Sequence, residues 1–181
     1  MRCFIAFEIP EEVKKVLIEA QSQLDKDMAK LSLTKDFHLT LKFLGEIDEN
    51  KVEEIKKKLS EIKFDSFETS LTDIGVFPGE DYIRVVWIGL GDPKNAIKEL
   101  QHEIDEKLQK LGFEKDERFH PHVTLARVKF TEDRESLLKN LKEITFEKKS
   151  FKVNEFKLKK STLTGEGPIY EDLAVFRNLF K

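Results

Sequence analysis

One short pattern occurs twice in this chain, as His38-Leu39-Thr40-Leu41 in the first half and as His122-Val123-Thr124-Leu125 in the second. Side chains alternate between the two faces of a β-strand, so the histidine and the threonine of each stretch share one face. The apolar residues share the other face. Each stretch therefore predicts a strand that packs one side into a core and presents an imidazole and a hydroxyl on its other side.

The residues around these two stretches repeat as well. In each half an apolar strand (residues 2–8, then 83–88) precedes an amphipathic helix, and the histidine strand follows. His38 lies 36 residues after Arg2, and His122 lies 38 residues after Arg84. Equal order at nearly equal spacing predicts an internal duplication.

Helices are expected at four places, because apolar residues recur there at spacings of three and four. A proline, Pro10 or Pro93, is expected to open the first helix of each half. Strand-like sequence follows the second helix of each half, over Phe67–Ile74 and Phe151–Leu158. The stretch Gly75–Gly79 is predicted to form a turn or loop between strands. The apolar helix positions are Val13, Val16, Leu17, Ala20 and Leu24; Val52, Ile55, Leu59 and Ile62; Ile97, Leu100, Ile104, Leu108 and Leu111; and Leu137, Leu138, Leu141 and Ile144.

This pattern predicts an α+β fold with two lobes related by an approximate twofold axis. Each lobe is a duplicated strand-helix-strand unit, the two antiparallel sheets face each other, and the helices lie outside. At 181 residues, and with no Ser/Gly-rich linker between the halves, the chain is expected to form one domain over residues 1–181, made of two interleaved lobes with a shared cleft.

Composition limits the possible partners and settings. Charged residues make up 37% of the chain but sum to −3, so no broad electrostatic surface for nucleic acid is expected. The first apolar run is interrupted by Glu8 and Pro10, and no run of eighteen apolar residues exists, which predicts neither a signal peptide nor a membrane span. The single cysteine, Cys3, is expected to be a buried small side chain in a reducing cytoplasm. A high Lys and Glu content favours a thermophilic source.

The paired motifs predict acid–base chemistry at a phosphate. Opening a cyclic phosphate needs a base for water and an acid for the departing oxygen, and His38 and His122 can serve as either near neutral pH. Thr40 and Thr124 can donate hydrogen bonds to non-bridging oxygens, and Arg127 can supply a fixed positive charge. The alternative for the histidines is packing on half-buried strands, and the alternative for Arg127 is a surface ion pair.

Both motifs, the stretch Gly75-Val76-Phe77-Pro78 followed by Arg84-Val85-Val86-Trp87, and the ending Ala126-Arg127 together resemble the two-histidine (2H) phosphoesterase superfamily. Within it the chain is most similar to the RNA 2′,3′-cyclic phosphodiesterase branch, also called 2′-5′ RNA ligases. The resemblance covers the chain from Phe4 to about Leu163.

The resemblance implies metal-independent hydrolysis of a terminal 2′,3′-cyclic phosphate on RNA to a 2′-phosphate, without a cofactor, and an association with 2′-5′ joining of RNA ends. It implies that His38 donates a proton to the leaving 3′ oxygen and that His122 activates water. The residues alone fit either assignment. The partners expected are RNA ends or nucleotides with a cyclic phosphate, and the chain is expected to be a monomer.

Several other residues have competing interpretations. His120 and His122 have a spacing that metal sites use, but Pro121 and the lack of an Asp or Cys at a recognisable spacing speak against a metal. His102 is expected on a solvated helix face. Phe43, Phe77, Tyr82 and Phe119 could stack on a base, although core packing is favoured for each. A lysine-rich stretch, Lys148, Lys149, Lys152, Lys157, Lys159 and Lys160, is interpreted as a solvated strand face.

Three classes of function therefore stay open. The chain could be a cyclic phosphodiesterase acting on RNA ends or on small cyclic nucleotides. It could be a nucleotide- or RNA-end-binding module without catalysis, or a partner-binding protein whose histidines pack in the fold. A turnover assay distinguishes the three. The enzyme forms product, the binding module shows saturable binding without product, and the partner-binding protein shows neither.

Overall fold

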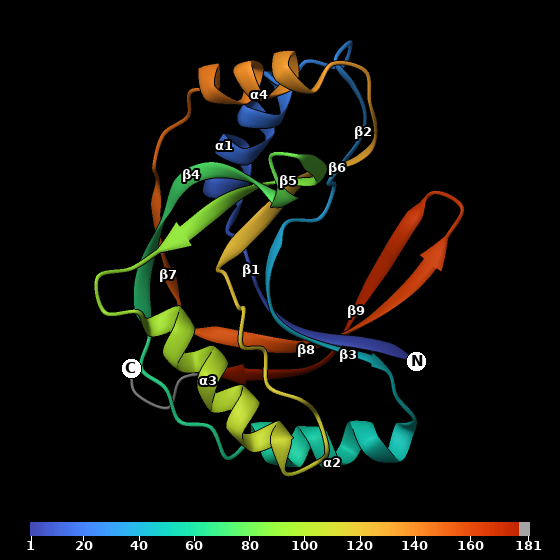
Figure 1. Cartoon of the computed structure of the whole chain (residues 1–181). Coiled ribbons are helices and arrows are strands. Elements are labelled where there is room, and N and C mark those ends of the chain that lie inside the picture. The colour runs from blue at the N-terminus through green and yellow to red at the C-terminus, as the bar shows by residue number, and fades with distance from the viewer. Residues whose placement is uncertain (178–181) are drawn as a thin grey trace.

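The computed structural model describes residues 1–177 and contains two antiparallel sheets and four helices in that range (Figure 1). The strands are β1 (Arg2–Glu8), β2 (Ala29–Leu33), β3 (His38–Glu46), β4 (Phe67–Gly79), β5 (Tyr82–Gly91), β6 (His122–Thr131), β7 (Ser150–Val153), β8 (Glu155–Thr164) and β9 (Gly167–Arg177). The helices are α1 (Glu11–Ser22), α2 (Glu49–Leu59), α3 (Ala96–Gln109) and α4 (Arg134–Glu143).

The strands of the two halves are exchanged between the sheets. Sheet A has the order β3-β1-β8-β9, and sheet B has the order β2-β6-β5-β4-β7. The central strands of sheet A, β3-β1-β8, correspond to β6-β5-β4 of sheet B under the duplication. Strand β4, after α2 in the first half, thus joins sheet B, and its counterpart β8 in the second half joins sheet A, while the short β7 between α4 and β8 stays in sheet B next to β4.

The helices follow the same exchange. Helix α1 of the first half contacts β6, and α3 of the second half contacts β3. Helices α1 and α4 lie at one end of the molecule and α2 and α3 at the other, with the sheets between them (Figure 1). The α+β architecture with outer helices, predicted from the duplication, is confirmed. The apolar helix faces and the inner strand faces form one contiguous core, which includes the free, buried Cys3.

Local sequence fixes most of the helix starts. Asp48 and Asp133 accept hydrogen bonds from the backbone N–H groups of Lys51 and Ser136, as N-cap residues do. Pro10 directly precedes α1. Pro93 does not open α3, because that helix begins at Ala96, whose N–H donates to the Asp92 carboxylate (2.6 Å).

Two expectations about strands were wrong. Residues 75–79 are not a loop but the end of β4, paired with β5 as far as Gly79–Tyr82. Gly75 is suited to a strand here because the Trp87 ring of β5 lies over it and leaves no room for a Cβ. The strand expected over Phe151–Leu158 is two strands, because the chain leaves sheet B after Val153 and enters sheet A at Glu155. Strands β2 and β9 were not predicted.

Candidate active site

His38 begins β3 and lies opposite Glu8 of β1 in the sheet A register. Its ring packs against Phe4 and Tyr170, with ring centroids 5.0 and 5.1 Å away. Burial lowers the pKa of His38 to about 4, although nearby Asp36 opposes this shift. The Nδ1 atom is buried and has no hydrogen-bond partner among residues 1–177. His38 is therefore neutral at pH 7 in the free protein.

The depressed pKa of His38 predicts how stability depends on pH. A histidine that titrates near 4 when folded and near 6.5 when unfolded binds more protons in the unfolded chain between those values, so stability rises with pH across that window. The contribution is present above pH 6.5 and is lost as the pH falls toward 4. It amounts to roughly 3 kcal/mol at about 1.4 kcal/mol per pKa unit.

The variant His38→Gln cannot titrate and should lack this contribution. Urea unfolding at pH 7 and pH 4.5 is therefore expected to show a smaller loss of stability for His38→Gln than for the wild type. His102→Gln is the control, because this side chain is exposed on α3 and should behave as the wild type. An equal loss in all three proteins would contradict the assignment.

His122 begins β6 and differs from His38 in its hydrogen bonding. Its Nδ1 lies 2.6 Å from the carbonyl oxygen of His120. A carbonyl oxygen only accepts, so Nδ1 carries the proton and the neutral ring leaves Nε2 with a lone pair. Burial lowers the pKa of His122, and the charge of Arg127 lowers it further, while the hydrogen bond to His120 opposes this. The ring lies edge-on to Phe77, 4.9 Å between centroids.

Both threonines lie on the same strands as the histidines, two residues further on. Thr40 is opposite Ala6 in sheet A, and Thr124 is opposite Trp87 in sheet B. Both side chains are half-buried, and within residues 1–177 neither hydroxyl is hydrogen-bonded. Each hydroxyl is thus free to donate to a ligand.

Arg127 is exposed on β6 and forms no ion pair with a residue of the described part. The alternative of a surface ion pair has no support there. Its charge acts on His122 of its own strand and on Tyr170 of β9. Tyr170 in turn packs against His38, so a residue beside His38 lies within electrostatic reach of the strand that carries His122. Strands β3 and β6 are themselves in contact.

Tyr170 was missed by the sequence analysis. Its strand was not predicted, and the only signal was its place in the alternating pattern of residues 167–177. The Tyr170 ring lies edge-on to Phe4 (5.2 Å) as well as to His38. Burial raises the pKa of its hydroxyl, with Asp36 acting in the same direction and Arg127, Lys159 and Arg2 opposing. A neutral phenol, a hydrogen-bond donor, therefore stands beside His38.

The lysine-rich stretch is not a solvated strand face throughout. Lys159 is only 6% exposed and Lys157 only 12%, and both ammonium groups bind Glu8 and Asp172 at 2.7–3.0 Å. This paired cluster lies on the face of sheet A that carries His38. Lys148 and Lys152 are exposed, as predicted, and Lys148 forms an ion pair with Asp73 at the surface. Burial next to carboxylates, rather than solvation, explains Lys157 and Lys159.

The expected core packing of the aromatic residues was wrong for two of them. Phe43 is 70% exposed and Tyr82 is 62% exposed. Phe77 packs on Trp87 and on both His120 and His122. His102 is solvated on α3, as predicted. Among residues 1–177 no three His, Cys, Asp or Glu side chains converge on one point.

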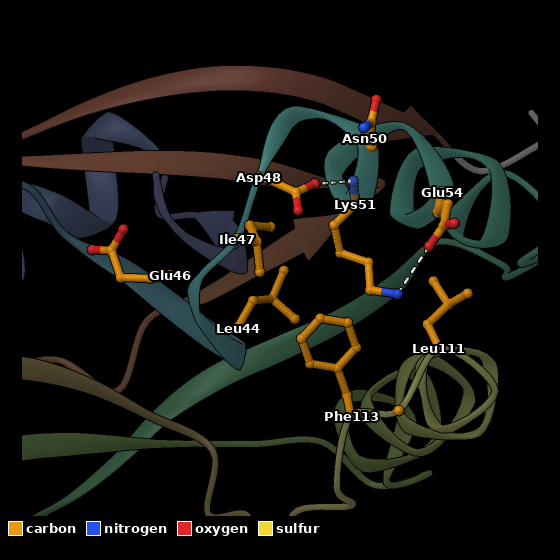
Figure 2. A pocket seen from close by; sticks show the side chains of 10 residues that line it. Leu44, Glu46, Ile47, Asp48, Asn50, Lys51, Glu54, Leu111 and Phe113 are labelled. Atoms are coloured by element: carbon orange, nitrogen blue, oxygen red, sulfur yellow. Dashed lines mark hydrogen bonds and ion pairs between the residues drawn. The ribbon is translucent and has the colours of Figure 1, made fainter.

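A hollow of about 470 Å³ lies away from the histidines, between the end of β3, the start of α2 and the turn after α3 (Figure 2). Its floor is apolar, with Leu44, Leu111 and Phe113, and its rim carries Glu46, Asp48 and Glu54. Figure 2 shows Lys51 directed to Glu54, with its backbone held by Asp48. A rim of carboxylates repels phosphate, so this hollow is unsuited to a cyclic phosphate ester.

Comparison with solved structures defines the class of protein to which this fold belongs. The chain superposes on the crystal structure of TT0787 of Thermus thermophilus with a TM-score of 0.83 and 27% identity, covering 98% of this chain and 97% of the other. It superposes on Escherichia coli LigT complexed with 3′-AMP with a TM-score of 0.79 and 25% identity, over 99% and 98% of the two chains. The fold is that of a LigT-type phosphoesterase.

The sequence comparison gives the family. The model of the LigT-like phosphoesterases matches twice, at residues 7–87 and 88–170, as the duplication requires, and the chain belongs to this family. An RNA 2′,3′-cyclic phosphodiesterase of Methanocaldococcus jannaschii is 41% identical over 94% of this chain and 97% of its own length. One from Methanothermobacter thermautotrophicus is 35% identical over 98% of both. Some of these relatives come from thermophilic organisms, in agreement with the thermophilic source that the high Lys and Glu content favours.

In residues 1–177 no helix is both long and apolar enough to span a bilayer.

Proposed function

We propose that the protein hydrolyses terminal 2′,3′-cyclic phosphates on RNA to 2′-phosphates, without a metal or other cofactor. The relatives from Methanocaldococcus jannaschii and Methanothermobacter thermautotrophicus are named RNA 2′,3′-cyclic phosphodiesterases, and they match this chain over nearly its whole length. The observation that carries the proposal is the placement of the two histidine strands, β3 and β6, next to each other, with Tyr170 in contact with His38 and within electrostatic reach of Arg127.

His122 is assigned as the general base. The His120 carbonyl holds the proton on Nδ1, so Nε2 can take a proton from water. A lowered pKa keeps this imidazole neutral at neutral pH. With a 5′-hydroxyl in place of water, the same groups would join two RNA ends through a 2′-5′ linkage.

His38 is assigned as the general acid that protonates the leaving 3′ oxygen. Its pKa of about 4 in the free protein means that the substrate must raise this pKa, and the negative charge of a bound cyclic phosphate does so. Phosphate binding and protonation of His38 are then coupled, so productive binding takes up a proton. Thr40, Thr124 and Arg127 are assigned to the non-bridging oxygens of the phosphate.

We further propose that residues 1–181 form one domain of two interleaved lobes that acts as a monomer in the cytoplasm. The exchange of β4 and β8 supports the single domain, because each sheet contains strands of both halves.

The test is to incubate the protein with an oligoribonucleotide that ends in a 2′,3′-cyclic phosphate, in the presence of a strong chelator. The expected product carries a 2′-phosphate, which can be distinguished from the 3′ isomer by chromatography against both standards. A 3′-phosphate would reverse the leaving-group assignment. Saturable binding without any product, on RNA and on cyclic mononucleotides, would instead establish a binding module.

A further inference from the structure

The β8–β9 hairpin extends beyond the rest of sheet A as a two-stranded arm (Figure 1). The last pair between β1 and β8 is Arg2–Ser161, whereas β8 and β9 remain paired to the turn, through Thr162–Ile169, Leu163–Pro168 and Thr164–Gly167. Residues 162–169 thus pair only with each other, and both faces of the arm are available to solvent.

The two faces of the arm differ in chemistry. Strand alternation places Ser161, Tyr170, Leu163 and Pro168 on the face that also carries Lys159 and His38. Leu163 is 69% exposed there. The opposite face carries Ile169, 61% exposed, and an ion pair between Lys160 and Glu171 at 3.9 Å.

The face shared with His38 has the composition of a single-strand nucleic-acid surface. It begins at the aromatic ring of Tyr170 beside His38, on which a base can stack, and continues to the exposed side chains of Pro168 and Leu163, which offer further apolar contact to bases. Arg2 lies at its base, opposite Ser161, and its charge reaches Tyr170. Within the paired stretches 161–164 and 167–170 no carboxylate lies on this face, and Asp172 and Glu8 further along it are paired with Lys157 and Lys159.

We propose that this face of the arm binds the nucleotides 5′ to the cyclic phosphate end, so that the protein prefers an RNA chain to a cyclic mononucleotide. The proposal rests on the proposed function, since it needs the phosphate at His38. The apolar residues contact the bases, and Arg2 contacts the sugar-phosphate backbone. The arm thereby makes substrate length a determinant of the reaction.

Two substitutions on opposite faces of the arm test this proposal. Leu163→Ser removes an exposed apolar side chain from the face shared with His38, and Ile169→Ser removes a similar one from the other face. For an oligoribonucleotide of four residues with a cyclic end, Leu163→Ser is expected to lower kcat/KM by roughly 5- to 10-fold, the effect of losing a contact with one base. Activity on a cyclic mononucleotide should be unchanged, and Ile169→Ser should change neither.

Equal losses on both substrates, or equal losses from both substitutions, would overturn the proposal. A second measurement is the affinity of the same oligonucleotide carrying a fluorescent label and a 2′-phosphate end, which reports on the arm without turnover. If the wild type turns over neither substrate but Leu163→Ser still weakens this binding, the proposed function is wrong, whereas the proposal that the arm binds RNA is retained. The wild type could instead self-associate, and Leu163→Ser could abolish this self-association without changing the affinity for the oligonucleotide. That result would assign the face to a second copy of the chain and overturn the proposal.

Discussion

His122→Ala is expected to lower kcat on an RNA 2′,3′-cyclic phosphate by about 10² to 10⁴-fold, the usual contribution of a positioned general base. Without this imidazole, water must attack without transferring its proton, while Thr124 and Arg127 still hold the phosphate. KM should therefore change much less than kcat. The fold should persist, because the His122 ring is only half-buried and its one hydrogen bond is to a neighbouring carbonyl. Single-turnover kinetics with the purified variant measure the effect.

His102→Ala is the matched control, because that histidine is exposed on α3 and should retain full activity. His38→Gln is expected to lose activity to a similar extent, and the double variant with His122→Ala to lose little more, since the two groups act in one step. Retention of activity by His122→Ala within tenfold of the wild type would remove this residue from the chemistry.

The acid and base assignments can be separated with one modified substrate. Sulfur in place of the 3′ oxygen leaves as a thiolate and needs little protonation. On such a substrate His38→Gln is expected to recover most of the wild-type rate, whereas His122→Ala is not. Recovery by His122→Ala alone would exchange the two assignments.

Lys42→Met is expected to destabilise the fold by about 3–5 kcal/mol, the cost of leaving a buried charge without its partner. Lys42 on β3 is 6% exposed and its ammonium group contacts the carboxylate of Asp105, 3% exposed on α3. It also donates to the Glu114 carbonyl oxygen (2.6 Å). The second oxygen of Asp105 accepts from Gln101 (2.8 Å) and from the backbone N–H of Asp116 (2.8 Å). Removing the ammonium group of Lys42 therefore leaves the buried carboxylate of Asp105 without its cation.

Urea unfolding measures this loss, and Lys51→Met is the control. Lys51 also pairs with a carboxylate, Glu54 at 2.9 Å, but at the surface, where such a pair contributes about 0–1 kcal/mol. Replacing both Lys42 and Asp105 with apolar residues should recover part of the stability, since no unpaired charge then remains. A loss in Lys42→Met no larger than in Lys51→Met would show that the pair does not hold α3 against β3.

The four helices could be predicted because their apolar residues recur at helical spacing, and the fold class could be predicted because the order of elements repeats. The exchange of β4 and β8 between the sheets could not be predicted. It is a matter of pairing between distant segments, and either partner offers the same alternating pattern. The wrong prediction of a loop over Gly75–Gly79 has a related cause. Only the position of the Trp87 ring shows why Gly75 belongs in a strand.

The motif residues His38, Thr40, His122 and Thr124 were found from spacing alone, whereas Tyr170 was not. Its strand was not predicted, and its contact with His38 joins the two edge strands of sheet A, β9 and β3, which are far apart in the sequence. The burial of Lys157 and Lys159 was equally hidden, because their partners Glu8 and Asp172 are distant in sequence. Charge runs indicate solvated faces only where no oppositely charged strand lies beside them.

The exchanged strands also restrict how such a protein could be divided or assembled. A fragment containing only the first half would have β1 with one edge bare, and its β4 would have no β5 to pair with. Two identical half-length fragments could satisfy each other by donating this strand reciprocally across a twofold axis. The present chain is then equivalent to a strand-swapped dimer whose two subunits have been fused, and neither half is expected to fold as an isolated monomer.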